Sequence, residues 1–66
     1  MKKLKTNTFS IINVHKKASL KSEIVTQLIF GQRFTILNKL NKWIKIRIQE
    51  DNYMGYIRER NYYPNL

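Results

Sequence analysis

The stretch WIKIRIQEDNYMGYI, residues 43–57, decides the fold that we expect for this chain. Its first half places isoleucine at every second position, with larger or charged side chains in between. A period of two puts successive side chains on opposite faces of a β-strand. Glu50, Asp51 and Asn52 then interrupt the alternation with residue types that favour turns. The stretch therefore predicts a β-hairpin that directs four isoleucines into the core, namely Ile44, Ile46, Ile48 and Ile57.

Three further apolar runs precede this hairpin. Residues 9–14 are rich in β-branched side chains, and residues 24–30 form a second run. The third run, residues 33–40, alternates and is expected to place three apolar side chains on one face, those of Phe34, Ile36 and Leu40. Each run has the length and composition of a short strand, so strands account for most of the chain.

Turn signals separate the runs. Gly31 accepts the positive φ of a tight turn, and Asn41 with Lys42 fits a two-residue hairpin turn. Residues 58–63 fit a single helical turn, and no segment fits a long helix. The sequence therefore predicts an all-β fold, a small barrel of five to six strands with a short 3-10 turn near the C-terminus.

Length and composition limit the chemistry of the chain. Sixty-six residues allow one domain, which we expect over residues 9–66 after a flexible basic arm over residues 1–8. The absence of cysteine excludes disulfides and thiolate chemistry, and a single histidine argues against a zinc site. His15 has no nucleophile or metal partner in the sequence and is expected to be a loop residue. We expect no catalytic residue, no metal and no cofactor.

The charge balance is strongly basic. Thirteen Lys and Arg residues face four Asp and Glu residues, which gives a formal net charge of +9. Such a charge attracts polyanions such as nucleic acid, anionic lipid or an anionic wall polymer. The joint abundance of Lys, Ile and Asn is equally expected from an AT-rich coding sequence. Composition leaves these two explanations open.

The sequence contains no recognisable targeting segment. The basic start MKKLK is followed by TNTFSIINVHKK, which is too polar for the apolar part of a signal peptide. No apolar run approaches the roughly 18 residues that span a membrane. In the absence of such signals we expect a cytoplasmic location.

The order of motifs resembles a bacterial SH3-like (SH3b) domain. That family combines an Asn-Val-Arg strand, a loop of small residues, an aliphatic pair, a leucine and a glycine before a Val-x-Val strand. A Trp-x-x-Val strand and a final Gly-Trp-Val follow. The corresponding residues here are Asn13-Val14-His15, Ala18-Ser19, Ile24-Val25, Leu28, Gly31, Phe34, Ile36, Trp43, Ile46, Gly55-Tyr56-Ile57 and Tyr62. Departures from the pattern occur at His15, where arginine is usual, at Lys17-Ala18, where Gly-Pro is common, and at Tyr56, where tryptophan is usual.

The resemblance implies an SH3-like barrel and a non-catalytic binding or targeting role. Such domains accompany bacterial cell-wall hydrolases, including cysteine peptidases of the NlpC/p60 kind. There they bind peptidoglycan peptides or shape the cleft of the catalytic domain. A catalytic domain, if one belongs to this protein, is expected beyond residue 66.

Aromatic residues and one lysine form the predicted ligand-binding groove. We expect Trp43 to be partly exposed, because it shares a strand face with Lys45 and Arg47. An exposed aromatic ring offers a large contact area at a small cost in entropy. The alternative for each tyrosine is packing in the barrel with only its hydroxyl in water. The predicted groove residues are Trp43, Tyr53, Tyr56, Tyr62 and Lys17.

Ile29 and Phe30 form a predicted docking surface. A strand cannot bury two successive residues on the same face, so at least one of them is expected to be exposed. An exposed large apolar residue suggests contact with a catalytic domain or a second copy. The alternative is a single stray hydrophobic residue without a role.

Two other functions remain open from the sequence. A nucleic-acid-binding barrel would stack bases on aromatic rings and place Lys and Arg near phosphates. Against it, no RNP-type motif and no basic recognition helix occur in the sequence. The domain would otherwise act as a structural spacer or a dimer contact. Peptide or wall-fragment binding is the leading prediction.

Overall fold

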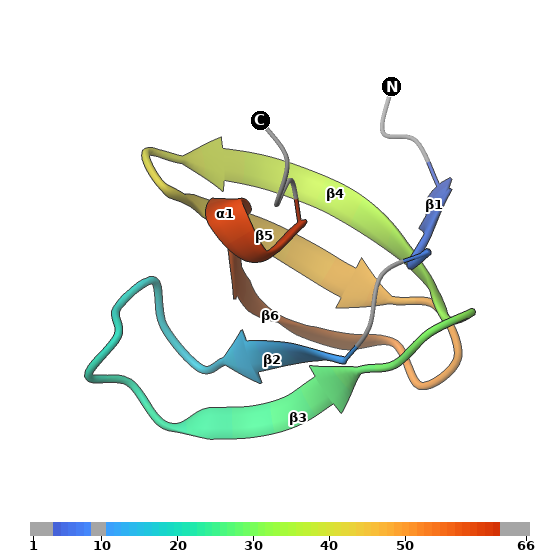
Figure 1. The fold of residues 1–66 in the computed structure, drawn as a ribbon, viewed down its shortest axis with the longest axis horizontal. Coiled ribbons are helices and arrows are strands. Elements are labelled where there is room, and N and C mark those ends of the chain that lie inside the picture. The colour runs from blue at the N-terminus through green and yellow to red at the C-terminus, as the bar shows by residue number, and fades with distance from the viewer. Residues whose placement is uncertain (1–3, 9–10, 63–66) are drawn as a thin grey trace.

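Residues 4–8 and 11–62 are described by a computed structural model. They form six strands and one short helix: β1 (Leu4–Thr6), β2 (Ile12–His15), β3 (Ile24–Leu28), β4 (Arg33–Leu40), β5 (Trp43–Ile48), β6 (Tyr53–Arg58) and α1 (Glu59–Tyr62). All strands pair antiparallel in one sheet of order β1-β4-β5-β6-β2-β3. The sheet curves strongly around a common interior (Figure 1). The predicted all-β, six-stranded fold is confirmed.

The β5–β6 hairpin is the predicted one. Ile44 lies opposite Ile57, and Ile46 lies opposite Gly55. The predicted core isoleucines are all buried. The whole core consists of Ile12, Val14, Leu28, Phe34, Ile44, Ile46, Ile48, Ile57 and Tyr62.

Strand β4 departs from the predicted alternation. Phe34 is fully buried, Ile36 is partly buried and Leu40 is exposed. The pairing of β4 with β5 shifts register between Ile36 and Asn38. Such an irregularity places an extra residue on one strand and changes which face the later side chains occupy. The expectation of one continuous apolar face from Phe34 to Leu40 is therefore wrong.

Asn7 joins the two edges of the sheet. Strands β1 and β3 end the strand order on either side and do not pair with each other. Directly after β1, the fully buried Asn7 donates its backbone N–H to the Gln32 carbonyl (2.9 Å) and accepts from the Gly31 N–H (2.8 Å). Its Nδ2 donates to the carbonyl of Leu28 (3.0 Å). The sheet is thus open by strand pairing, while Asn7 bridges the gap.

The expectation of a flexible arm over residues 1–8 is wrong for Leu4–Thr6, which form β1. Leu4, Lys5 and Thr6 pair with residues 33–35 of β4. Backbone pairing does not require apolar side chains, so this polar segment gave no strand signal. Residues 1–3 and residues 9–10, the start of the first expected strand, lie outside the described residues.

The helical turn expected over residues 58–63 is a four-residue α-helix, not a 3-10 turn. Tyr62, at its end, packs edge-on against Phe34, with ring centroids 5.4 Å apart. At its start, Glu59 donates its backbone N–H to the Lys42 carbonyl (2.8 Å). These two contacts fix α1 beside the β4–β5 hairpin.

Candidate binding site

Five side chains from three strands form a cluster on the outer face of the sheet. In β5 and β6, Trp43 lies opposite Arg58, and Lys45 lies opposite Tyr56. On the other side of β6, His15 of β2 lies opposite Tyr56. Directly opposite residues in antiparallel strands project from the same face. We call His15, Trp43, Lys45, Tyr56 and Arg58 the outer cluster.

Aromatic and cation–π contacts hold the outer cluster together. The His15 ring meets the Trp43 ring edge-on, with centroids 5.0 Å apart and planes at 77°. The Arg58 guanidinium carbon lies 5.6 Å from the centre of the Trp43 ring, and Lys45 Nζ lies 6.0 Å from the centre of the Tyr56 ring. Aromatic faces attract cations at such distances. The cluster is therefore an aromatic centre surrounded by positive charge.

The burial of Trp43 corrects one prediction. Its side chain is only 8% exposed, although it shares a face with Lys45 and Arg47. His15 and Arg58 cover the ring, and both come from other strands. His15 itself is the last residue of β2 and is buried, so the expectation of a loop residue is also wrong. Its Nδ1 lies 3.2 Å from the Ser22 carbonyl, within reach to donate a hydrogen bond.

Gly55 brings β2 close enough to complete the cluster. A Cβ at this position would lie 2.4 Å from Val14 Cγ1 and 3.1 Å from the His15 carbonyl oxygen. Real Cβ atoms essentially never come as near as the first of these distances. The absence of a side chain at Gly55 thus lets the β2 backbone approach closely, and this approach sets His15 beside Tyr56.

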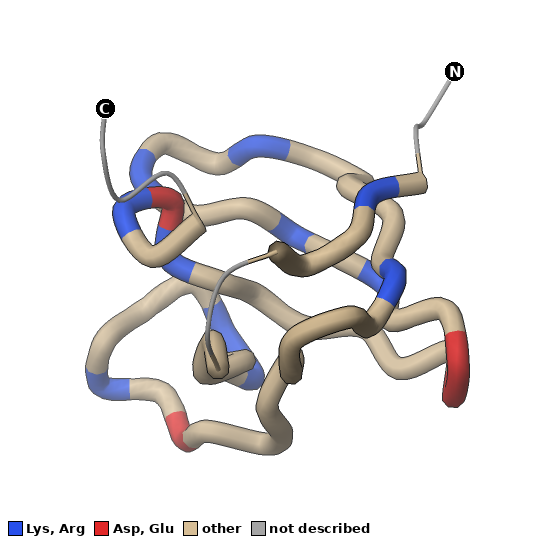
Figure 2. Tube along the Cα trace, turned by 45° about the vertical axis from the view of Figure 1, so that its right-hand side comes forward, with Lys and Arg blue, Asp and Glu red and all other residues tan. Residues whose placement is uncertain are grey.

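Lys17 lies in the loop over residues 16–23, beside the outer cluster. Its backbone N–H donates to Ser22 Oγ (2.8 Å), and Lys16 N–H donates to the Glu23 carbonyl (2.9 Å). This loop surrounds a shallow hollow of about 360 Å³ lined by Lys16, Lys17, Ser19, Lys21, Ser22 and Glu23. Figure 2 shows that Lys and Arg greatly outnumber Asp and Glu along the described chain.

Tyr53 and Tyr62 do not join Trp43 and Tyr56 in one groove. Tyr62 is a core residue, so its ring is not available to a surface ligand. Tyr53 is 42% exposed but lies opposite Ile48, on the other face of β6 from Tyr56. The structure therefore places Trp43 and Tyr56 in the outer cluster and Lys17 in the loop that follows β2, whereas Tyr53 and Tyr62 lie elsewhere. Ligand binding by the surface residues stays a prediction.

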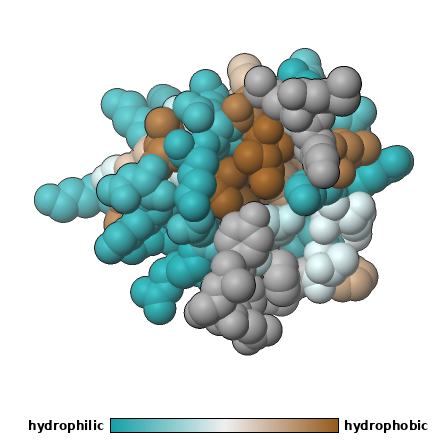
Figure 3. Space-filling view, turned by 90° about the horizontal axis from the view of Figure 1, so that it is seen from above, coloured by the Kyte–Doolittle hydropathy of each residue, from teal (hydrophilic) through white to brown (hydrophobic). Residues whose placement is uncertain are grey.

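Ile29 and Phe30 are both exposed, by 48% and 69%. They follow β3 and precede the positive φ of Gly31, so strand alternation does not apply to them. Ile29 N–H is fixed by Gln32 Oε1 at 2.8 Å. Viewed from above, the surface shows hydrophobic side chains between hydrophilic ones (Figure 3). Docking through Ile29 and Phe30 stays a prediction.

Besides His15, the sequence patterns did not assign Arg58 to the candidate site. Its signal was present in the hairpin, because a register that pairs residue 44 with residue 57 also pairs Trp43 with Arg58.

Across residues 4–8 and 11–62, no three His, Cys, Asp or Glu side chains gather into a possible metal site. No helix of the described chain has the length and apolar character needed to cross a membrane.

Comparison with known proteins identifies one family. The model of the bacterial dipeptidyl-peptidase SH3 domain matches residues 14–61, more than half of the chain. Curated proteins and solved structures gave no significant match. The family match agrees with the resemblance to bacterial SH3-like domains that the motif order indicated.

Proposed function

Since the chain belongs to the bacterial dipeptidyl-peptidase SH3 domain family, we propose that it is a peptide-binding accessory module of a cell-wall hydrolase. SH3-type domains are usually non-catalytic and assist a neighbouring enzyme. The specific proposal is that this module binds peptidoglycan peptides for a peptidase of the NlpC/p60 kind. Binding would hold the enzyme on its polymeric substrate.

The outer cluster carries this proposal. Tyr56 is partly exposed between Lys45 and His15, on strands that are paired on both sides. A rigid aromatic ring provides contact area for a peptide chain, while nearby cations attract its carboxylates. Trp43 holds His15 and Arg58 in place on the same face, because both side chains pack against its ring.

The double substitution Tyr56→Ala with Lys45→Gln tests the proposal. We expect it to weaken cosedimentation with purified peptidoglycan by about tenfold, the usual effect of losing a central contact residue. Tyr53→Ala is the matched control, since it removes an exposed tyrosine from the opposite face of the same strand. Circular dichroism establishes that each variant is folded. Unchanged binding by the folded double variant rejects the outer cluster as the peptide site.

Nucleic acid is the competing ligand for the same face, given the net charge of +9. The salt dependence of binding separates the two. A complex with nucleic acid weakens steeply as log salt rises, because phosphate contacts release counterions. Binding of a peptide with one or two charges changes far less. Tight, salt-sensitive binding of an oligonucleotide with no retention on peptidoglycan would favour the nucleic-acid function.

Ile29 and Phe30 support a second role for the module, docking on a catalytic domain. Both side chains are exposed and give the turn after β3 an apolar surface. Phe30→Ser should lower the affinity for the catalytic domain, while the free energy of unfolding of the module changes by less than about 0.5 kcal/mol. Calorimetric titration of the two domains and urea unfolding measure these quantities. Unchanged affinity would mean that Phe30 has no docking role.

A further inference from the structure

A second hollow lies where the tip of loop 16–23 approaches the end of β6 and the start of α1. It measures about 310 Å³ and is lined by Leu20, Arg58, Arg60 and Asn61. Its volume is at the lower end of the range for small-ligand sites. It adjoins the outer cluster through Arg58, which belongs to both.

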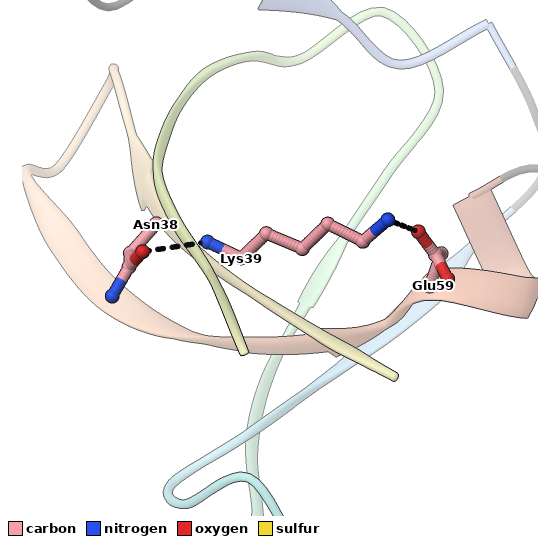
Figure 4. Close-up of polar contacts among 3 residues, drawn as sticks. All are labelled: Asn38, Lys39 and Glu59. Carbon is pink, nitrogen blue, oxygen red and sulfur yellow. Dashed lines mark hydrogen bonds and ion pairs between the residues drawn. The ribbon is translucent and has the colours of Figure 1, made fainter. Parts of the chain in front are cut away.

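The two arginines of this hollow keep their positive charge available. Glu59, the acidic residue between them in sequence, is bound to Lys39, with Nζ and Oε2 2.5 Å apart (Figure 4). Within the described chain, no carboxylate forms an ion pair with Arg58 or Arg60. Contact with the Trp43 ring restrains the Arg58 guanidinium from one side. The hollow thus presents two guanidinium groups that no carboxylate of the described residues neutralises.

We propose that this hollow binds the free C-terminal carboxylate of a peptide. Guanidinium groups match a planar carboxylate with two parallel hydrogen bonds, and the Asn61 amide offers a further donor. Leu20, 68% exposed at the rim, contacts the side chain of the terminal residue. This inference rests on the proposed function and specifies which end of the peptide is recognised.

Leu20 favours a peptide over a polyphosphate as the ligand. An exposed leucine can bury apolar surface against a peptide side chain, whereas a polyphosphate has no apolar group to place against it. Phosphate-driven binding would instead involve the lysines of the neighbouring hollow, Lys16, Lys17 and Lys21, as strongly as the two arginines. The pairing of two arginines with one leucine is therefore the feature that selects a carboxylate-terminated peptide.

Calorimetric titration of the whole protein tests the proposal with two probes, N-acetyl-trialanine with a free carboxylate and the same peptide as its C-terminal amide. We expect the free acid to bind at least about tenfold more tightly, as is usual for hydrogen bonds between charged groups. Arg60→Gln should abolish this preference and leave the Arg58–Trp43 contact in place. Arg33→Gln is the control, because it removes the same charge from the far end of β4.

Fluorescence of Trp43, the single tryptophan, gives an independent readout beside the site. The free acid should change its emission in the wild-type protein and not in Arg60→Gln. Equal affinity for acid and amide overturns the carboxylate site, and so does tighter binding of inorganic phosphate than of the acid. In either case retention on peptidoglycan tests the proposed function separately, since the outer cluster can bind a peptide without recognising its end.

Discussion

Asn7→Asp is expected to destabilise the protein by about 3–5 kcal/mol at neutral pH. The substitution replaces the Nδ2 donor, 3.0 Å from the Leu28 carbonyl, with a carboxylate oxygen. Two oxygens then face each other, and a negative charge is placed at a position with 0% exposure. An uncompensated buried charge costs about 3–5 kcal/mol. A domain of 66 residues has a total stability of about 3–10 kcal/mol, so the loss is a large fraction of it.

Two further variants separate the effect of the lost hydrogen bond from the effect of the buried charge. Asn7→Ala removes the hydrogen bond without adding charge and should cost about 1–3 kcal/mol. Thr8→Asp adds the same charge at the exposed neighbouring position and should change stability by less than about 0.5 kcal/mol. Thermal unfolding followed by circular dichroism measures all three. If Asn7→Asp melts within a few degrees of the wild type, Asn7 does not join the sheet edges as described.

Gly55→Ala is expected to destabilise the domain by about 1–3 kcal/mol through overpacking. The added Cβ meets Val14 Cγ1 at 2.4 Å, and Val14 is a fully buried core residue with no room to retreat. Val14→Ala alone should also destabilise the domain, by about 2 kcal/mol, because it leaves a cavity. Urea unfolding gives the free energy for each variant.

The double variant separates steric conflict from other causes. With alanine at both positions, the new methyl group occupies space that the valine vacated. The double variant should therefore be more stable than the sum of the single effects predicts, by about 1 kcal/mol. The 3.1 Å approach to the His15 carbonyl remains and leaves part of the cost in place. Strict additivity would contradict the contact between Gly55 and Val14.

The hairpin over residues 43–57 was predictable because its signals are local. Alternating isoleucines and a polar turn specify strand, register and buried face within fifteen residues of sequence, and Ile44 and Ile57 lie as predicted. The burial of Trp43 was not predictable in this way. It depends on His15, which is 28 positions earlier and reaches Trp43 only because Gly55 lets β2 approach. Alternation fixes a face of a strand, while long-range neighbours decide whether that face is covered.

In the candidate site, too, the residues within the hairpin were predictable and those placed by distant segments were not. Trp43 and Tyr56 are both predicted groove residues, and both lie in the outer cluster because they belong to the same hairpin. Tyr62 was assigned to a groove because its motif position says nothing of packing, and its contact with Phe34 joins segments on either side of the hairpin. The Leu20 hollow combines a loop tip with α1, two segments that no local pattern connects.

The bridge made by Asn7 has a consequence for where this domain should be cut. The family match begins at residue 14, so a boundary drawn there would remove β1 and Asn7. The shortened chain would keep the outer cluster and the isoleucines of the β5–β6 hairpin but lose the core residue Ile12. The Leu28 carbonyl would lose its partner, and β4 would gain an open edge. An unprotected strand edge is a template for association with other chains. Trimming the chain to the matched range would thus expose the edge of β4 and favour association with other chains, an edge that the polar segment containing β1 covers in the whole domain.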